Sequence, residues 1–290
     1  MVRGGRAAVV VGAKIRLNGR CRKSMLELEF GEQSDQGRVR EGNEDYVGHV
    51  LPATTGQARS HGWLFALADG VGGQALGEVA SRAAVEALRA GFRSARAGES
   101  LSALLPRLVQ EANQRVLEAA SAAGPAGAGM ATTLVACALR FDSVVIAHVG
   151  DSRCYLVRKG RALALTRDHT VASEQLHLGV LSAQEASDSP TRHVLSRSLG
   201  AGLFVNVETA FHPLFPDDVL VLCSDGLHGS VTDWDMAASV GRYHDLNAAA
   251  KELVALANQR DGSDNITVQL IRVRKVEHVG MYRGRPYKLS

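Results

Sequence analysis

The sequence predicts an α+β fold in which helices are laid on antiparallel sheets. Three observations support this class. Strand-like runs outnumber helical patterns, several of these runs adjoin across short turns such as 140–143 and 158–161, and no strand–helix–strand unit repeats along the chain. Short turns join antiparallel neighbours, whereas parallel neighbours need a longer crossover.

The predicted strands are short apolar runs bounded by polar or glycine-containing segments. In chain order they are Leu26–Phe30, Trp63–Ala68, Thr132–Leu139, Val144–Val149, Cys154–Val157, Phe204–Thr209, Val219–Cys223 and Ile266–Val273. No linker-like break separates them, so we expect one domain.

Helices are predicted between these runs, at Leu76–Phe92, Leu101–Ala120 and Leu246–Gln259. In the first two, apolar residues recur every three or four positions, which gives a helix one apolar face. The small residues Gly124–Gly129 predict a loop, and the polar, mixed segment 168–200 predicts an excursion at the surface.

Charge divides the chain into an acidic body and two basic ends. Residues 1–24 hold seven basic residues and no acid, and residues 271–290 hold six basic residues and one acid. Of the 33 basic and 30 acidic residues, 20 and 29 therefore lie in 25–270, a net charge of −9. We expect a basic disordered extension at 1–24, one domain at 25–275 and a basic tail at 276–290. An acidic body argues against a nucleic-acid-binding core.

Composition excludes several other classes of protein. The chain is 46% hydrophobic and 22% charged, which is ordinary for a globular protein. No apolar run approaches the roughly 18–20 residues of a membrane-spanning helix, so we expect no membrane partner. The four cysteines are far apart and form no CxxC pair, which argues against a structural zinc site or a disulfide framework and favours a cytoplasmic protein.

Acidic residues next to glycine mark the ends of several predicted strands. Asp69-Gly70, Gly150-Asp151 and Asp225-Gly226 follow apolar runs, whereas Asp264 and Asp45 precede them. In an antiparallel sheet the ends of some strands and the starts of others share one edge, so these carboxylates can converge.

Converging carboxylates repel one another unless a cation neutralises them. Oxygen ligands select hard cations such as Mg²⁺ or Mn²⁺, and two such ions can hold a hydroxide between them for displacement at phosphorus. The alternative is that each Asp-Gly pair is an ordinary turn. Any one pair alone would favour the turn, but their repetition beside apolar strands favours a metal site.

Seven segments in order resemble one family, and they span about residues 31–272. The segments are Ser34–Gly37 with Arg40–Asp45, Ala68–Gly73, Ala131–Leu134, Val149–Arg153, Leu195–Gly200, Ser224–Leu227 and Gly262–Val268. The chain resembles the metal-dependent protein phosphatases of the phosphatase 2C type, in their bacterial form.

This resemblance implies a four-layer α-β-β-α sandwich of two antiparallel sheets flanked by helices, with two Mn²⁺ or Mg²⁺ ions at one end. By the same resemblance, Asp69 should bridge both ions and Gly70 should offer its carbonyl to one, while Asp225 and Asp264 should bind the other. Attack by a water or hydroxide between the ions would then hydrolyse the phosphate ester.

Further roles also follow from the resemblance. Asp45 and Glu44 should act beside the ions, partly through bound waters, and Asp151 falls where bacterial members hold a third, weaker ion. Arg40 should bind the substrate phosphate, which suits a planar guanidinium with paired donors. The segment 168–200 matches the family's flap, which is tied to substrate choice.

The implied activity is hydrolysis of phosphoserine and phosphothreonine in proteins, opposing a bacterial serine/threonine kinase, by a protein we expect to be a monomer. Animal members carry a His directly after the Asp-Gly where this chain has Val71, which leaves the general acid unassigned. His169 and His193 lie in the flap segment and are weak candidates for a direct role. His148, within an apolar run, is expected to be a core residue.

Two rival functions fit the residues less well. A pseudophosphatase that only binds phosphoproteins would typically lack metal-binding acids, and this chain keeps them. A dinucleotide loop at Gly70–Gly73 departs from GxGxxG spacing, and Asp69 would oppose a pyrophosphate there.

Overall fold

Two antiparallel sheets form the centre of the molecule. The structure is a computed structural model, and it describes residues 25–71, 76–282 and 285–288. The first sheet has the spatial order β1 (Glu27–Asp35), β11 (Ile266–Lys275), β10 (Val219–Cys223), β7 (Arg153–Arg158) and β8 (Arg161–Ala164). The second has the order β2 (Asp45–Val50), β3 (Trp63–Val71), β5 (Leu134–Arg140), β6 (Ser143–Val149) and β9 (Glu208–Pro213), with β4 (Ala131–Thr132) paired to β3.

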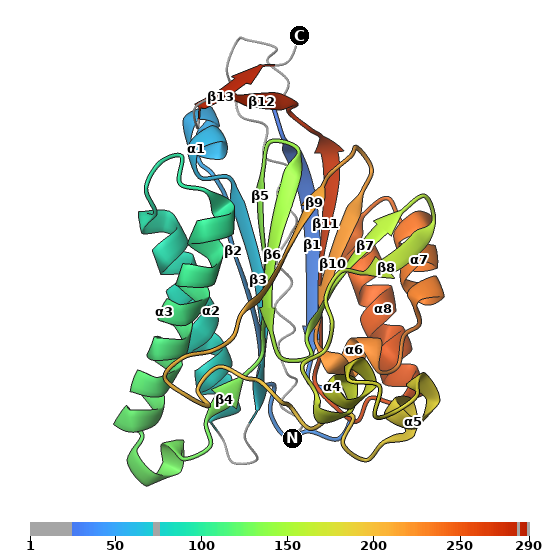
Figure 1. The fold of residues 1–290 in the computed structure, drawn as a ribbon. Helices are drawn as coiled ribbons and strands as arrows, with labels where there is room; N and C mark the ends of the chain where they lie inside the picture. Colours follow the sequence, from blue (N-terminus) through green and yellow to red (C-terminus); the bar gives the residue numbers. More distant parts are fainter. Residues whose placement is uncertain (1–24, 72–75, 283–284, 289–290) are drawn as a thin grey trace, which may run out of the picture.

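Helices cover the outer face of each sheet, as Figure 1 shows. α2 (Gly77–Ser94) and α3 (Leu101–Ala122) lie on the second sheet, and α7 (Asp233–Arg242) and α8 (Leu246–Arg260) lie on the first. The short helices are α1 (Thr55–Ser60), α4 (Val171–His177), α5 (Ala183–Asp188) and α6 (Asp225–His228), with a 3₁₀ turn at Gly124–Gly127. The predicted four-layer α-β-β-α sandwich is therefore confirmed.

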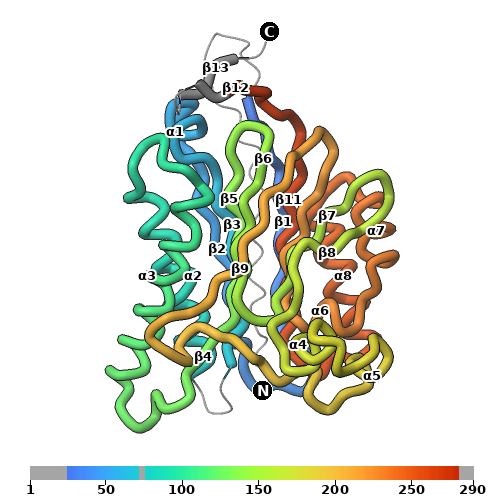
Figure 2. The backbone as a smooth tube through the Cα atoms, viewed as in Figure 1, coloured from blue at the N-terminus to red at the C-terminus, as the bar shows by residue number. Residues whose placement is uncertain are grey.

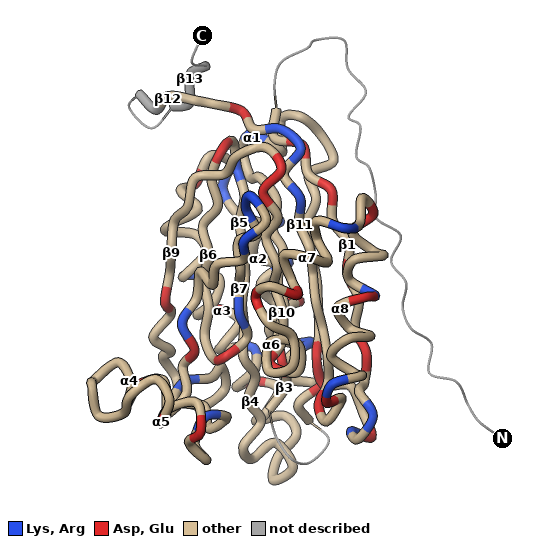
Figure 3. The backbone as a smooth tube through the Cα atoms, turned by 90° about the vertical axis from the view of Figure 1, so that its right-hand side faces the viewer, with Lys and Arg blue, Asp and Glu red and all other residues tan. Residues whose placement is uncertain are grey.

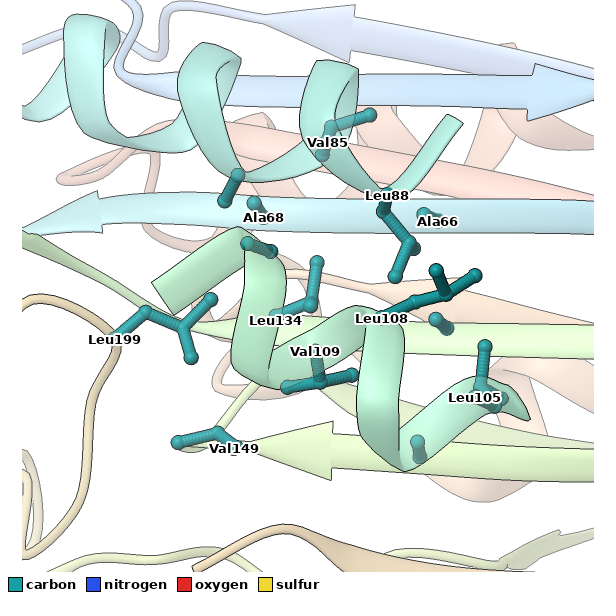
Figure 4. Packing of buried hydrophobic residues seen from close by; sticks show 14 of the residues in the cluster. Ala66, Ala68, Val85, Leu88, Leu105, Leu108, Val109, Leu134, Val149 and Leu199 are labelled. Carbon is teal, nitrogen blue, oxygen red and sulfur yellow. The ribbon is translucent and has the colours of Figure 1, made fainter. Parts of the chain in front are cut away.

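Each pair of neighbouring layers encloses its own apolar core. Leu88 of α2 and Leu108 of α3 meet Leu134 of β5 in the outer core drawn in Figure 4. Phe65 of β3 lies in the core between the two sheets, and Leu253 of α8 lies in the third core. Burial of a large apolar side chain contributes roughly 1.5–3 kcal/mol, so these cores stabilise the frame that positions the strand ends.

The predicted strand at Phe204–Thr209 is wrong for its first four residues, 204–207. β9 begins only at Glu208, and Phe204 is 90% exposed. Backbone groups here form hydrogen bonds with side chains of α3 instead. The Asn113 amide donates to the Gly202 carbonyl oxygen at 2.8 Å, and the Val205 N–H donates to the Gln110 side-chain oxygen. These bonds replace the ladder that a strand would need.

The chain after Lys275 begins as part of the packed body. Val276 lies in the core between the sheets, and the buried Glu277 pairs with Arg59 at 2.9 Å. Residues Val279–Tyr282 (β12) and Arg285–Lys288 (β13) form a two-stranded hairpin in the segment expected to be a tail. The expected extension at 1–24 lies outside the described residues.

Some elements carried weaker sequence signals. α7 was not predicted, although Thr232 and Asp235 form a capping box at its start.

The segment 168–200 contains α4 and α5 and lies at one end of the sandwich, as the tube in Figure 2 shows. In the view of Figure 3, acidic and basic residues are both scattered over the body. None of the described helices has the length and apolar character needed to span a bilayer.

Candidate active site

Strand pairing brings the predicted acidic residues to one end of the sandwich. Asp45, the first residue of β2, is the register partner of Asp69 near the end of β3. Asp151 follows the end of β6, Asp225 begins α6 after β10, and Asp264 comes just before β11. This is the lower end of the molecule in Figure 1, near β4 and α6.

The electrostatics of Asp69 show that these carboxyl groups form one cluster. Burial raises the pKa of Asp69 well above its usual value, and the charges of Asp45, Asp225, Asp151 and Asp264 raise it further. A shared divalent cation would stabilise the charged forms of all these groups at once.

Asp45 has one carboxylate oxygen with a partner and one without. Its Oδ2 accepts a hydrogen bond from Ser224 Oγ at 2.8 Å, whereas its buried Oδ1 has no hydrogen-bond partner. Burial raises the pKa of Asp45 to about 7, although the hydrogen bond from Ser224 and the nearby Thr267 hydroxyl oppose the shift. An unpartnered buried carboxylate oxygen is costly, so the residues present fit a cation at this position.

Hydroxyl groups that sequence reasoning missed hold Asp45 in place. Ser224 Oγ also accepts the Thr267 N–H at 3.0 Å, and Thr267 Oγ1 lies 2.7 Å from Ser34 Oγ. Asn43 donates to Ser34 Oγ and accepts the Asp45 N–H. All four residues lie within the segments that resemble the family, but no role was predicted for any of these side chains.

A second hydroxyl network holds Asp69. Thr133 Oγ1 accepts the Asp69 N–H at 3.0 Å, and Thr132 Oγ1 donates to the Asp69 carbonyl oxygen at 2.7 Å. Thr133 Oγ1 also lies 2.7 Å from Ser152 Oγ. Because Ser152 follows Asp151, this network links the backbones that carry two of the acidic residues.

Asp151 is buried at the edge of the cluster. Burial raises the pKa of Asp151 to about 7, and the charge of Asp225 contributes to the shift. His228 Nε2 donates to the Asp151 carbonyl oxygen at 2.9 Å, which helps to fix the backbone that carries this carboxylate.

Gly70 lies where β3 meets the start of α2. A Cβ atom on Gly70 would lie 2.2 Å from the Gly77 carbonyl oxygen, and the Gly70 N–H donates to the Glu44 carbonyl oxygen at 3.1 Å. Only glycine permits this approach. Burial raises the pKa of the Glu44 carboxyl group.

Arg40 extends over the cluster from the loop between β1 and β2. Its Nη2 donates to Asp264 Oδ2 at 2.7 Å, and its side chain is 54% exposed. The bond to Asp264 raises the pKa of Arg40. The guanidinium is therefore held beside the carboxylates while part of it faces solvent, where an anion can reach it.

Comparison with known proteins identifies the family of this chain. A family model described as protein phosphatase 2C matches residues 43–265. The chain belongs to the protein phosphatase 2C family. A serine/threonine phosphatase of Listeria welshimeri is 35% identical over 263 residues, which cover 90% of this chain and 99% of the relative. The serine/threonine protein phosphatase PstP of Mycobacterium tuberculosis is 34% identical over 245 residues, 84% of this chain and 44% of that longer protein.

Solved structures of the protein phosphatase 2C family share the fold. The Streptococcus agalactiae serine/threonine phosphatase has a TM-score of 0.78 and 31% identity, covering 85% of this chain and 100% of that one. The PstP catalytic domain in complex with two manganese ions has a TM-score of 0.73 and 31% identity, covering 87% and 100%. The chain is therefore a serine/threonine phosphatase of the protein phosphatase 2C type, an enzyme class that depends on Mn²⁺ or Mg²⁺.

The three histidines considered in the sequence, His148, His169 and His193, lie in different surroundings. His193 Nδ1 lies 4.0 Å from Asp225 Oδ2, and its side chain is largely exposed. His169 is fully buried, so it does not reach the surface of the site. His148 is also buried and donates to the Arg167 carbonyl oxygen at 2.8 Å, as expected of a core residue. Val71, directly after the Asp-Gly, is partly exposed and supplies no proton.

Proposed function

We propose that this phosphatase hydrolyses phosphoserine and phosphothreonine in proteins with two divalent cations, Mn²⁺ or Mg²⁺, held by the acidic cluster. Asp69 would be shared between the cations and Gly70 would offer its carbonyl to one, while Asp225 and Asp264 would hold the other. Asp45 and Glu44 would act beside them. The observation that carries the proposal is the buried, unpartnered Oδ1 of Asp45 among carboxyl groups whose pKa values are raised.

When bound, such cations polarise a phosphoryl oxygen and lower the pKa of a water. The chain's own residues supply position and charge. The Ser224 hydroxyl donates to the Asp45 carboxylate and holds it in place. The Thr133 hydroxyl accepts the Asp69 N–H and holds that backbone. The Arg40 guanidinium would bind the phosphoryl group with paired N–H donors.

Asp151 would hold a third, weaker cation in this proposal. Its buried carboxyl lies near Asp225 at the edge of the cluster, and its neighbour Ser152 is bonded to Thr133. With few protein oxygens on offer, such a cation would keep several waters and bind weakly. We further propose a monomeric, cytoplasmic enzyme that opposes a serine/threonine kinase.

Metal removal tests the two-cation proposal. The purified chain should hydrolyse p-nitrophenyl phosphate and a phosphothreonine peptide in Mn²⁺ or Mg²⁺, and excess EDTA should stop both reactions. Restoring Mn²⁺ should restore the rate, which separates metal loss from unfolding. Full activity in EDTA would refute the role of the cations. A catalytically silent phosphoprotein-binding chain would instead bind the peptide without hydrolysing it in either condition.

Replacing Arg40 with Ala should raise KM for a phosphopeptide by roughly 10-fold. A charge-assisted hydrogen bond contributes about 1.5–3 kcal/mol, and each 1.4 kcal/mol is a factor of ten in affinity. Because the Arg40 side chain is about half exposed, we expect a contribution at the lower end of this energy range. Steady-state kinetics measures it, with a smaller loss in kcat if the contact strengthens in the transition state.

Arg38→Ala is the matched control for Arg40→Ala. Arg38 is an exposed arginine of the same loop and fixes it through its backbone N–H, which donates to the Gly262 carbonyl oxygen at 2.7 Å. The control removes the same charge and should leave KM nearly unchanged. Equal KM changes in the two variants would show that Arg40 acts only through its positive charge and not through a contact with the phosphate.

A further inference from the structure

His169 lies at the junction between the Gly150–Asp151 loop and the segment 168–200. Its side chain is fully buried. Its N–H donates to the Gly150 carbonyl oxygen at 3.0 Å, and its ring Nδ1 accepts the Gly150 N–H at 3.2 Å. Its carbonyl oxygen accepts the Ser196 N–H at 2.9 Å. One residue therefore joins the loop that carries Asp151 to both ends of the segment.

The hydrogen bonds fix the proton on the His169 ring. A backbone N–H can only donate, so Nδ1 must accept from Gly150 and carry no proton. Nε2 then carries the proton and donates it to Glu208 Oε2 at 3.2 Å. Burial lowers the pKa of His169 to about 4, which keeps the ring neutral at neutral pH. Glu208 and Gly150 thus select the same tautomer from opposite sides.

A metal ion does not explain this arrangement. His148, His169 and Glu208 each offer a ligand atom within 4.8 Å of the others. However, a metal on His169 Nε2 would displace the proton to Nδ1, where it would face the Gly150 N–H. His148 Nε2 likewise donates its proton to the Arg167 carbonyl oxygen, so the same nitrogen of both stacked rings is already occupied by a hydrogen bond.

Gly150 has little freedom besides this contact. Its φ of +102° suits glycine, and a Cβ atom would lie 2.7 Å from Thr133 Cβ. Thr133 therefore restricts Gly150 on one side while the His169 ring binds it on the other. Because Asp151 follows directly, the position of its carboxylate depends on both contacts.

We propose that His169 is a positioning residue. Its Nδ1 lone pair accepts the Gly150 N–H and thereby sets where the Asp151 carboxylate lies. The same residue ties the segment 168–200 to this loop. This inference rests on the proposed metal-dependent activity. His169 touches neither substrate nor cation, and it acts through Gly150. Groups that orient metal ligands in this way typically change metal affinity or activity by about 10–100-fold when they are replaced.

Two variants of His169 separate the proposed contact from packing. Asn places an oxygen acceptor near the position of Nδ1, so His169→Asn can still hold the Gly150 N–H. Gln places its amide near the position of Nε2, so His169→Gln keeps a donor for Glu208 and loses the Gly150 acceptor. Both variants remove the ring and its stacking on His148.

The experiment measures activity against Mn²⁺ concentration for full-length wild type, both His169 variants and Asp151→Asn, with melting temperatures in EDTA. We expect His169→Gln to raise the half-activating Mn²⁺ concentration by roughly 10-fold, in the direction of Asp151→Asn, and His169→Asn to stay within a few-fold of wild type. The same Mn²⁺ response in both His169 variants would overturn the proposal.

A pair of variants at the partly exposed Glu208 tests the proposal if the His169 variants fail to fold. Glu208→Gln keeps an acceptor for the Nε2 proton, and Glu208→Leu removes it, while both remove the charge. We expect only Glu208→Leu to shift the Mn²⁺ response and to alter the ¹⁵N shifts that report the His169 tautomer. Equal responses would overturn the proposal. A wild type without metal-dependent activity would refute the proposed function instead, before any variant is compared.

Discussion

Replacing Asp69 with Asn should lower kcat by about 10³-fold or more while the chain stays folded. Asn keeps the side-chain volume and removes the charge that the two cations would share. The cations would stabilise charge in the transition state by several kcal/mol. Losing this stabilisation would lower kcat by about 10³-fold, because each 1.36 kcal/mol is a factor of ten in rate. The measurement is kcat in saturating Mn²⁺, with calorimetric titration to count the bound ions.

The same substitution should not destabilise the metal-free protein. The pKa of Asp69 is raised, so the fold favours its uncharged form and loses stability as the pH rises through that pKa. In EDTA at mildly alkaline pH, Asp69→Asn should therefore melt at the same temperature as wild type or higher. A large drop in melting temperature would mean that Asp69 acts in folding rather than in binding cations.

Asp217→Asn controls for the loss of a carboxylate. Asp217 lies in a turn with φ of +70°, a conformation that Asn also tolerates, and its side chain is 85% exposed. It lies just before β10, at the opposite end of that strand from Asp225. This variant should keep the wild-type kcat and metal count.

The sequence predicted the acidic cluster because each of its members adjoins a strand end. The apolar runs into Asp69 and Asp225 locate β3 and β10, and antiparallel pairing then places the residues at one edge. The core strands were predictable for the same reason, because a buried strand is apolar over its whole length. Their roles as metal ligands stay predictions until ions are measured.

The groups that support the cluster could not be predicted in this way. Ser34 Oγ and Thr267 Oγ1 lie 2.7 Å apart but are separated by 233 positions in the chain. Serine and threonine are common at the surface, so their composition carries no signal of such a contact. His169 was considered only for direct chemistry, since its bonds to Gly150 and Glu208 depend on tertiary packing.

The wrong prediction of a strand over 204–207 has a related cause. Phe204, Val205 and Val207 give the apolar character of a strand, and Val205 and Val207 do pack against the outer core. The Val205 N–H donates to the Gln110 side chain, and the Gly202 carbonyl oxygen accepts from Asn113, so the backbone leading to β9 bonds to side chains of α3. An apolar pattern in the sequence indicates which residues are buried. A strand also needs a neighbouring strand whose backbone groups can pair with its own.

Replacing Gly70 with Ala should impair both the fold and the reaction. The added Cβ would lie 2.2 Å from the Gly77 carbonyl oxygen and 2.3 Å from its carbonyl carbon, so the start of α2 must move away from β3. Overpacking of this kind costs about 1–3 kcal/mol, or roughly 2–4 °C in melting temperature for each kcal/mol in a domain of this size. The measurement is thermal unfolding in EDTA and in Mn²⁺.

The loss of activity in Gly70→Ala should exceed what the loss of stability explains. The Gly70 carbonyl is a predicted cation ligand, its N–H holds the Glu44 carbonyl, and Asp69 precedes it. A shift of about 1 Å at such a site can lower the rate by about 10²-fold, even at temperatures where the variant is fully folded. Gly42→Ala is the matched control, because a Cβ on Gly42 meets no atom within 4 Å. Wild-type kcat in folded Gly70→Ala would show that neither the Gly70 carbonyl nor its close contact with α2 is needed for the reaction.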